Sequence, residues 1–113
     1  MKIIFKNKKL EILTNNDKKL IKEFGTLRAT KIKMRLSQLS FAQTLEGVKS
    51  LPGNYHELTK NRKGQWACDL DQPYRLVFTP QENPIPVNQS GQYIWAEIEG
   101  IEIIEIVNYH KEK

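Results

Sequence analysis

The stretch from Trp66 to Phe78 constrains the fold of this chain more than any other part of its sequence. Apolar residues alternate with others on both sides of the turn Asp71-Gln72-Pro73, which is the pattern of a β-hairpin. With a three-residue loop, all six apolar residues of the two arms fall on one face: Trp66, Cys68, Leu70, Tyr74, Leu76 and Phe78. The same register sets Asp69 opposite Arg75. The sequence therefore predicts a sheet with one buried face.

Before Pro52 the apolar period is helical. Asn15-Asn16-Asp17 offers N-caps for a helix over 17–24, and Gly25 suits its C-terminus. Thr26 opens a second helix with apolar residues at helical spacing: Ala29, Ile32, Leu36 and Leu39. We expect two antiparallel helices joined at Gly25. A short strand over 2–6 is predicted before them, and a short helical turn over 44–48 after them.

The C-terminal half is predicted to supply the rest of the sheet and one long loop. Tyr55–Leu58 is a further candidate strand. Residues 80–100 hold three prolines and two glycines and are expected to form a long loop with a short edge strand over 93–98. The segment Ile101–Tyr109 is apolar on both faces, which is typical of a strand near the centre of a sheet. Strict alternation puts Ile101, Ile103 and Val107 on one face, and Ile104 and Ile106 on the other.

Length and composition indicate a single globular domain over residues 1–113. The chain is 39% hydrophobic and 27% charged, which excludes a collagen-like or disulfide-rich scaffold. It contains no apolar run near the ~18 residues of a transmembrane helix and no long apolar stretch at its start. A single cysteine, Cys68, cannot form an intramolecular disulfide, and at an apolar strand position it reads as a buried inert thiol. These features favour a reducing, cytoplasmic setting.

The charge divides unevenly along the chain. Residues 1–63 carry 15 Lys or Arg and 5 Asp or Glu, for a net charge of +10, whereas residues 64–113 carry a net charge of −5. A basic half on a small protein suggests a polyanionic partner such as nucleic acid, although a lysine-rich solvated surface is an equal alternative. Within the predicted second helix, Arg28, Lys31 and Arg35 share one stripe.

Three places in the sequence suit chemistry on a phosphate, and each has a simpler reading. Lys60, Arg62 and Lys63 crowd one turn at the mouth of the hairpin, which could also be an ordinary charged turn. Arg75 lies in mid-strand, where it either pairs with Asp69 or reaches a phosphate. Asn108-Tyr109-His110 lies at the end of the last predicted strand and could also be a frayed C-terminus. One cysteine and two distant histidines make no metal pattern, and no phosphate-binding glycine loop is present, so neither a metal nor a cofactor is expected.

Two strings carry a family resemblance. NRKGQWACDLDQPYRLVF, followed near the C-terminus by IEIVNYH, resembles the HigB branch of the RelE/ParE toxin superfamily, whose members share a basic-turn-and-hairpin core and end in Asp-Tyr-His or Asn-Tyr-His. The order of a short strand, two helices and a Leu-Pro turn before them also matches. The resemblance covers residues 1–79 and 101–110. It implies an α+β, RelE-like fold: two N-terminal helices on a small, twisted, mainly antiparallel sheet, with the 80–100 loop as an insertion.

The resemblance also implies a function and a site. Such proteins are toxins of type II toxin–antitoxin systems that cleave mRNA on the ribosome, here with His56, Arg75, Tyr109 and His110 as the catalytic set. The expected partners are the ribosome with its mRNA and an antitoxin, of helix-turn-helix type. Contacts to RNA or the ribosome are expected from the basic residues and the strand end: Arg28, Lys31, Arg35, Lys60, Arg62, Lys63 and Asn108.

Metal-independent RNA cleavage by the 2′-OH needs a base, an acid and cations on the phosphate, and these residue types supply all three. Which histidine would be base and which acid does not follow from the sequence. Two other functions remain open. One is an inactive partner-binding module of the same fold, which Thr59, Asp69 and Asp71 favour because relatives carry basic residues at comparable places. The other is a ParE-type gyrase inhibitor, which would not need the His/Tyr/His set.

Overall fold

The computed structural model describes residues 1–109 and has an α+β architecture. Its α-helices are α1 (Lys8–Thr14), α2 (Asp17–Phe24) and α3 (Thr26–Phe41). Its strands are β1 (Lys2–Phe5), β2 (His56–Glu57), β3 (Trp66–Asp69), β4 (Tyr74–Pro80) and β5 (Gly100–Asn108). Three short 3₁₀ helices complete the described part: η1 (Leu45–Ser50), η2 (Lys60–Arg62) and η3 (Trp95–Glu97).

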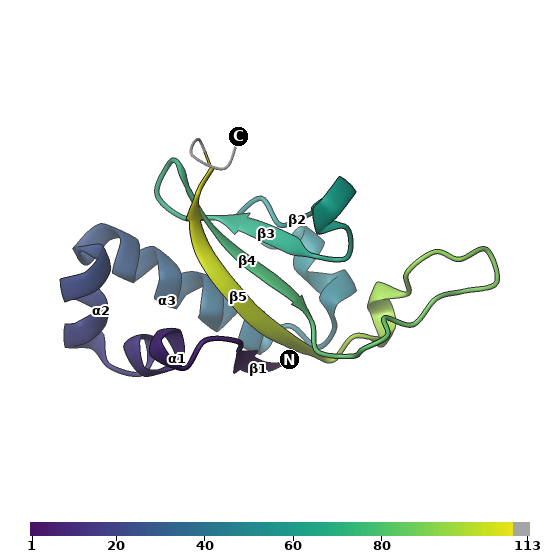
Figure 1. Ribbon diagram of the computed structural model, residues 1–113, viewed down its shortest axis with the longest axis horizontal. Coiled ribbons are helices and arrows are strands. Elements are labelled where there is room, and N and C mark those ends of the chain that lie inside the picture. The colour runs from purple at the N-terminus through teal and green to yellow at the C-terminus, as the bar shows by residue number, and fades with distance from the viewer. Residues whose placement is uncertain (110–113) are drawn as a thin grey trace.

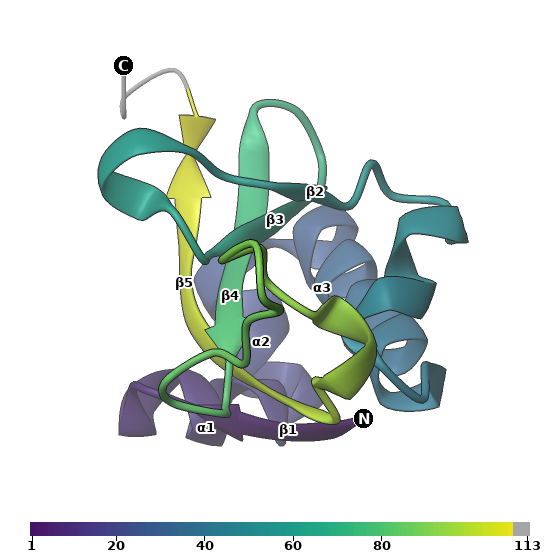
Figure 2. The same ribbon diagram turned by 90° about the vertical axis from the view of Figure 1, so that its right-hand side faces the viewer.

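Within residues 1–109 the strands form one mixed sheet in the order β1-β5-β4-β3-β2. β1 runs parallel to β5, and the other neighbours are antiparallel. Figures 1 and 2 show the long helix α3 on one side of the sheet and the segment that carries η2 on the other. The expectation of an α+β fold with a mainly antiparallel sheet is confirmed, as is the short N-terminal strand.

The predicted hairpin has the predicted register. Trp66 faces Phe78, Cys68 faces Leu76 and Asp69 faces Arg75, and the Leu70 amide donates to the Tyr74 carbonyl at 3.0 Å. The apolar face is buried against the helices, with Trp66, Cys68 and Phe78 fully inaccessible to solvent. This burial fixes the register, because a slip by one residue would turn every side chain of the strand to the other face.

Gly25 separates α2 from α3, as predicted. Its φ of 82° is a left-handed conformation that favours glycine, its amide donates to the Ile21 carbonyl at 2.7 Å, and its own carbonyl accepts from Ala29 at 3.0 Å. One residue therefore ends α2 and begins α3. Along α3 the predicted apolar face is buried, with Ala29, Ile32 and Leu39 at most 2% exposed.

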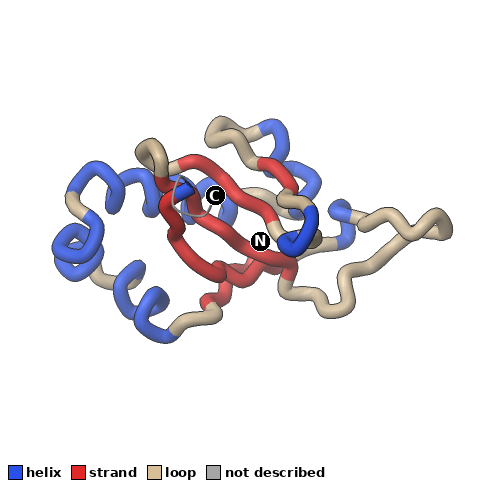
Figure 3. The backbone as a smooth tube through the Cα atoms, turned by 45° about the horizontal axis from the view of Figure 1, so that its top comes forward, coloured by secondary structure: helices blue, strands red, loops and turns tan. Residues whose placement is uncertain are grey.

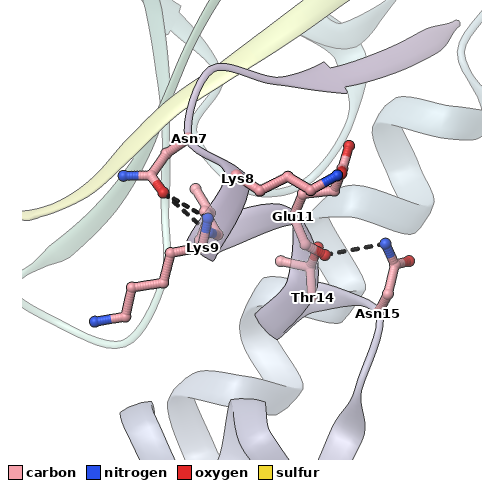
Figure 4. A network of polar contacts seen from close by, with 7 residues as sticks. Asn7, Lys8, Lys9, Glu11, Thr14 and Asn15 are labelled. Atoms are coloured by element: carbon pink, nitrogen blue, oxygen red, sulfur yellow. Dashed lines mark hydrogen bonds and ion pairs between the residues drawn. The ribbon is translucent and has the colours of Figure 1, made fainter.

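Helix α1 was not predicted. Its N-cap is Asn7, whose Oδ1 accepts from the amides of Lys9 at 2.8 Å and Leu10 at 3.3 Å (Figure 4). At its other end the Asn15 side-chain amide donates to the Glu11 carbonyl at 3.0 Å. The signal was the N-cap at Asn7 followed by Leu10 and Leu13 at helical spacing. Three helices, not two, therefore precede the 3₁₀ helix η1, which lies close to the predicted turn over 44–48.

The last strand departs from strict alternation. β5 pairs with β1 only over Gly100–Ile103 and with β4 along its length, so β4 rather than β5 is the middle strand. A bulge makes Phe78 face Ile103 while Val77 faces Glu105, which leaves Ile104 as the extra residue. Beyond the bulge, Ile106 joins the core and Val107 lies on the open face of the sheet. The predicted grouping of Val107 with Ile101 and Ile103 is therefore wrong.

The 80–100 loop is long, as predicted, but its edge strand over 93–98 is wrong. Tyr93 makes one isolated bridge with Val87, and the residues after it form η3. Trp95 and Ile98 pack into the core, and the Trp95 ring lies edge-on to Trp66 at 5.3 Å between ring centres. The apolar residues Trp95 and Ile98 therefore anchor η3 against the core instead of forming a strand. The remainder of the 80–100 loop projects away from the sheet (Figure 3).

No helix in the part of the chain that the structure describes is both long and apolar enough to cross a membrane.

Candidate active site

A pocket of about 710 Å³ lies on the open face of the sheet. This is the face opposite the one on which α3 lies in Figure 2. Its base is apolar, because Ala67 of β3, Val77 of β4 and Val107 of β5 point to this face. The chain from β2 through η2 forms one wall. Five residues with a predicted role line the pocket: His56, Lys60, Arg62, Arg75 and Tyr109. The structure thus gathers into one pocket residues that the sequence separates by as many as 53 positions.

Arg75 lies between a carboxylate and an aromatic ring. Its Nε is 3.6 Å from Asp69 Oδ1, across the β3–β4 pair. Its guanidinium carbon is 3.6 Å from the centre of the Tyr109 ring, which is a cation–π contact. Both contacts hold the side chain over the pocket, while Nη1 and Nη2 donate to no group within residues 1–109. The predicted Asp69–Arg75 pair is confirmed, and Arg75 lines the pocket with a planar pair of Nη groups that could donate to a ligand there.

His56 is held in one tautomer by the backbone. Its Nδ1 lies 2.7 Å from the Asn54 carbonyl oxygen, which can only accept, so Nδ1 carries a proton and donates. Asn54 has a φ of 55°, a turn conformation that asparagine tolerates, and its side chain donates to Asp69 Oδ2 at 3.2 Å. In the neutral imidazole, Nε2 is therefore the acceptor. This is the nitrogen with which His56 can take a proton.

The cations of the turn after β2 differ in their contacts. Arg62 Nη2 donates to Glu105 Oε1 at 2.5 Å, and Nη1 donates to Gln65 Oε1 at 2.8 Å. Lys60 is exposed and lines the pocket. Lys63 faces away from this pocket, with its Nζ 5.7 Å from the centre of the Tyr93 ring. The three residues were predicted as one cluster, but only Lys60 and Arg62 reach the pocket.

The stripe of Arg28, Lys31 and Arg35, which was expected to contact RNA or the ribosome, does not form one accessible surface. Arg35 is only 7% exposed, and its guanidinium donates to the Asp69 carbonyl at 2.8 Å and the Pro52 carbonyl at 3.2 Å. Arg28 forms a bidentate pair with Asp71, at 3.0 Å for both bonds, and lies over the Tyr74 ring. Both arginines therefore tie α3 to the hairpin, and only Lys31 remains a candidate contact for RNA.

Of the residues predicted to act at the end of β5, Tyr109 lines the pocket and Asn108 does not. Asn108 pairs with Tyr74 at the end of β5, and the Tyr109 amide donates to the Pro73 carbonyl at 2.9 Å. This bond ties the chain end to the hairpin turn, so Tyr109 is positioned by backbone as well as by Arg75. The predicted role of His110 lies outside the described residues.

Two residues of the site were missed by sequence reasoning. Glu105 neutralises Arg62, and the β5 bulge is what turns it to the open face. Asn54 orients both His56 and Asp69 from the turn before β2. An Asn after Gly53 is a turn signal that the sequence does contain, whereas nothing in the alternation of β5 indicates where a bulge falls.

Cys68 has no part in this pocket. The side chain is fully buried on the core face of β3, and burial raises the pKa of its thiol to about 12. The prediction of a buried thiol is confirmed. Among residues 1–109, no three His, Cys, Asp or Glu side chains come together as potential metal ligands.

Comparison with models of known protein families finds no match for this chain. Comparison with curated proteins finds no match either.

Proposed function

We propose that this protein is the toxin of a type II toxin–antitoxin system, with a RelE-like fold of the HigB kind, and that it cleaves mRNA on the ribosome. The observation that supports this most is the meeting of His56, Arg75 and Tyr109 in one pocket. The imidazole acceptor can be the base and the guanidinium the cation that metal-independent RNA cleavage requires, and the aromatic ring can stack on a nucleobase. The ribosome, mRNA and a cytoplasmic antitoxin are the partners this function entails.

The reaction uses the neighbouring hydroxyl of the RNA itself. The 2′-oxygen bonds to the adjacent phosphorus and the bond from phosphorus to the 5′-oxygen breaks, which leaves a 2′,3′-cyclic phosphate and a 5′-hydroxyl. His56 Nε2 takes the proton of the 2′-OH. Arg75 donates from Nη1 and Nη2 to the phosphoryl oxygens, where negative charge grows. The resemblance places His110 in the catalytic set without a role, and with His56 as the base, His110 is left as the candidate for the acid that protonates the leaving 5′-oxygen.

Tyr109 has a second role in this scheme beside a direct contact with the RNA. Its ring lies under the Arg75 guanidinium at 3.6 Å, so it holds the plane of the donor fork in one orientation. A fixed fork loses less conformational freedom when it binds phosphate than a free one does.

One specific observation favours the alternative, a partner-binding module without activity. Asp69 lies 3.6 Å from Arg75, and Glu105 lies 2.5 Å from Arg62, so both arginines of the pocket already have a carboxylate partner. Phosphate binding at Arg75 must compete with Asp69. The Nε edge used by Asp69 differs from the Nη fork, and for this reason we prefer the nuclease.

The test is translation of a defined mRNA by purified ribosomes with the purified protein. We expect cuts that depend on ribosomes and fragments that end in a 2′,3′-cyclic phosphate and begin with a 5′-hydroxyl. Fragments with a 5′-phosphate would exclude attack by the 2′-OH. Intact mRNA with continued translation would favour the partner module, and inhibition of DNA gyrase in place of RNA cleavage would favour a ParE-type inhibitor.

A further inference from the structure

A second pocket, of about 490 Å³, lies beside the first, and Glu57 lines both. The 80–100 loop supplies most of its lining, and the turn after η2 supplies Lys63. Arg62 lines the first pocket and Lys63 the second, so two consecutive cations mark the border between them. A single strand of RNA in the first pocket could therefore continue into the second past Arg62 and Lys63, and the carboxylate at this border, Glu57, is paired with Lys49 Nζ at 3.4 Å.

Aromatic rings form a fixed surface in this second pocket. The rings of Tyr93 and Trp95 are 5.0 Å apart between centres, and Trp95 packs at 89° on the fully buried Trp66. Tyr93 is half-buried and has Lys63 Nζ 5.7 Å from its ring centre. Single-stranded nucleic acids stack bases on anchored aromatic rings, and a base on this face of Tyr93 would take the place of Lys63 Nζ, which lies over the ring.

The tip of the loop is ordered by its own amide side chains. Asn88 Oδ1 accepts from the backbone amides of Ser90 at 2.9 Å and Gln92 at 3.0 Å, and its Nδ2 donates to Gln92 Oε1 at 3.1 Å. The oxygen of the Gln92 side chain is thereby engaged, and within residues 1–109 its Nε2 has no acceptor. This leaves a positioned donor at the rim of the pocket.

We propose that this second pocket binds a nucleobase of single-stranded RNA that flanks the nucleotide in the first pocket. Tyr93 stacks on the base, Gln92 Nε2 donates to its edge, and Lys63 contacts the adjoining phosphate. The identity of the substrate rests on the proposed function. What is added is a binding role for the 80–100 loop, so this loop extends the contact with RNA beyond the cleaved bond.

The experiment measures binding of fluorescent single-stranded RNA to the purified full chain by anisotropy, without ribosomes. We expect an RNA of about six nucleotides to bind more tightly than a dinucleotide, by roughly 5- to 150-fold if one stacked base makes the difference. Tyr93→Leu should abolish this gain, and Tyr93→Phe, which keeps the ring, should retain it. Gln92→Ala should weaken binding of the longer RNA, whereas Gln89→Ala, an exposed loop residue outside the pocket lining, should not.

Equal binding of the two RNAs by the parent protein, or an undiminished gain in a Tyr93→Leu protein with a parental melting temperature, would overturn the inference. If Tyr93→Leu lowers the melting temperature, the test uses Gln92→Ala and Lys63→Gln instead. Each of these variants must then show a smaller difference in affinity between the six-nucleotide RNA and the dinucleotide than the parent protein does. Binding is read without cleavage, so absence of cleavage on the ribosome rejects the proposed function alone. If cleavage occurs, Tyr93→Leu should raise KM and leave kcat unchanged.

Discussion

At the scale of single residues, arginines that look alike in sequence have different roles. Arg35 is buried and bonded to two backbone carbonyls, Arg28 pairs with Asp71, and Arg75 faces a pocket. Helical spacing placed Arg28 and Arg35 on one stripe, but it could not show that the hairpin and the Pro52 turn approach that stripe. Only Arg75 could be assigned from sequence, because the hairpin register fixed its neighbour Asp69.

Arg35 is expected to carry stability rather than RNA binding. The turn is built around it: a Cβ at Gly53, where φ is 130°, would lie 2.9 Å from the Arg35 guanidinium carbon. Arg35→Ala removes a buried side chain together with its hydrogen bonds to the part-buried Asp69 and Pro52 carbonyls, and should lower the free energy of unfolding by about 3 kcal/mol. Urea denaturation measures this. The control Lys33→Ala, which breaks an exposed pair with Asp17, should cost at most about 1 kcal/mol. Equal losses in both variants would contradict the assignment.

Cys68 should be inert in the folded protein. Burial raises the pKa of its thiol to about 12, so the folded chain keeps a proton that the unfolded chain loses near pH 9. The free energy of unfolding therefore falls as the pH rises above about 9. At about pH 8 the thiolate is scarce in the native state, and iodoacetamide should modify Cys68 only after urea unfolds the protein. Rapid modification of the native protein would show that the thiol is accessible and ionised.

At the scale of elements, the sequence indicated those whose apolar pattern is simple and missed those set by tertiary contacts. The hairpin β3–β4 and the helices on both sides of Gly25 follow from alternation, caps and one glycine. Helix α1 was not predicted because its seven residues make about two turns, which is too short for a clear helical period. The segment 93–98 alternates like a strand, yet the packing of Trp95 against Trp66 bends it into η3. Local pattern is overridden where a large aromatic side chain finds a place in the core.

The bulge in β5 can be tested by comparing two adjacent residues. It places Ile106 against the core and Val107 on the open face, whereas regular alternation places Val107 with Ile101 and Ile103. Ile106→Ala should lower the free energy of unfolding by about 2 kcal/mol and Val107→Ala by about 0.5 kcal/mol, because only the first removes core contacts. Urea denaturation decides between them. A larger loss for Val107→Ala would mean that the strand has no bulge there.

At the scale of the whole molecule, the two faces of the sheet differ: one packs against the hydrophobic core and the other carries the pocket. The helices and the core lie on one face. On that side Arg28 pairs with Asp71 and Arg35 is buried, so neither of these two arginines from the basic N-terminal half is free to bind a partner. The other face carries the pocket, at the border between the basic turn after β2 and the acidic C-terminal strands. The charge separation in the sequence therefore overestimates the number of arginines that the basic half contributes to accessible surface.

In the proposed function Arg75 is the ligand of the scissile phosphate, and the most direct test is the single-turnover rate of mRNA cleavage on the ribosome. Arg75→Ala should reduce this rate by roughly 100- to 1000-fold, since such a contact is worth about 3–4 kcal/mol in the transition state. Its melting temperature should barely change, because the partly exposed Asp69 pair is weak. The matched variant Asp69→Ala removes the competing carboxylate and should cleave at the parental rate or faster. An Arg75→Ala protein that cleaves at the parental rate would contradict the account.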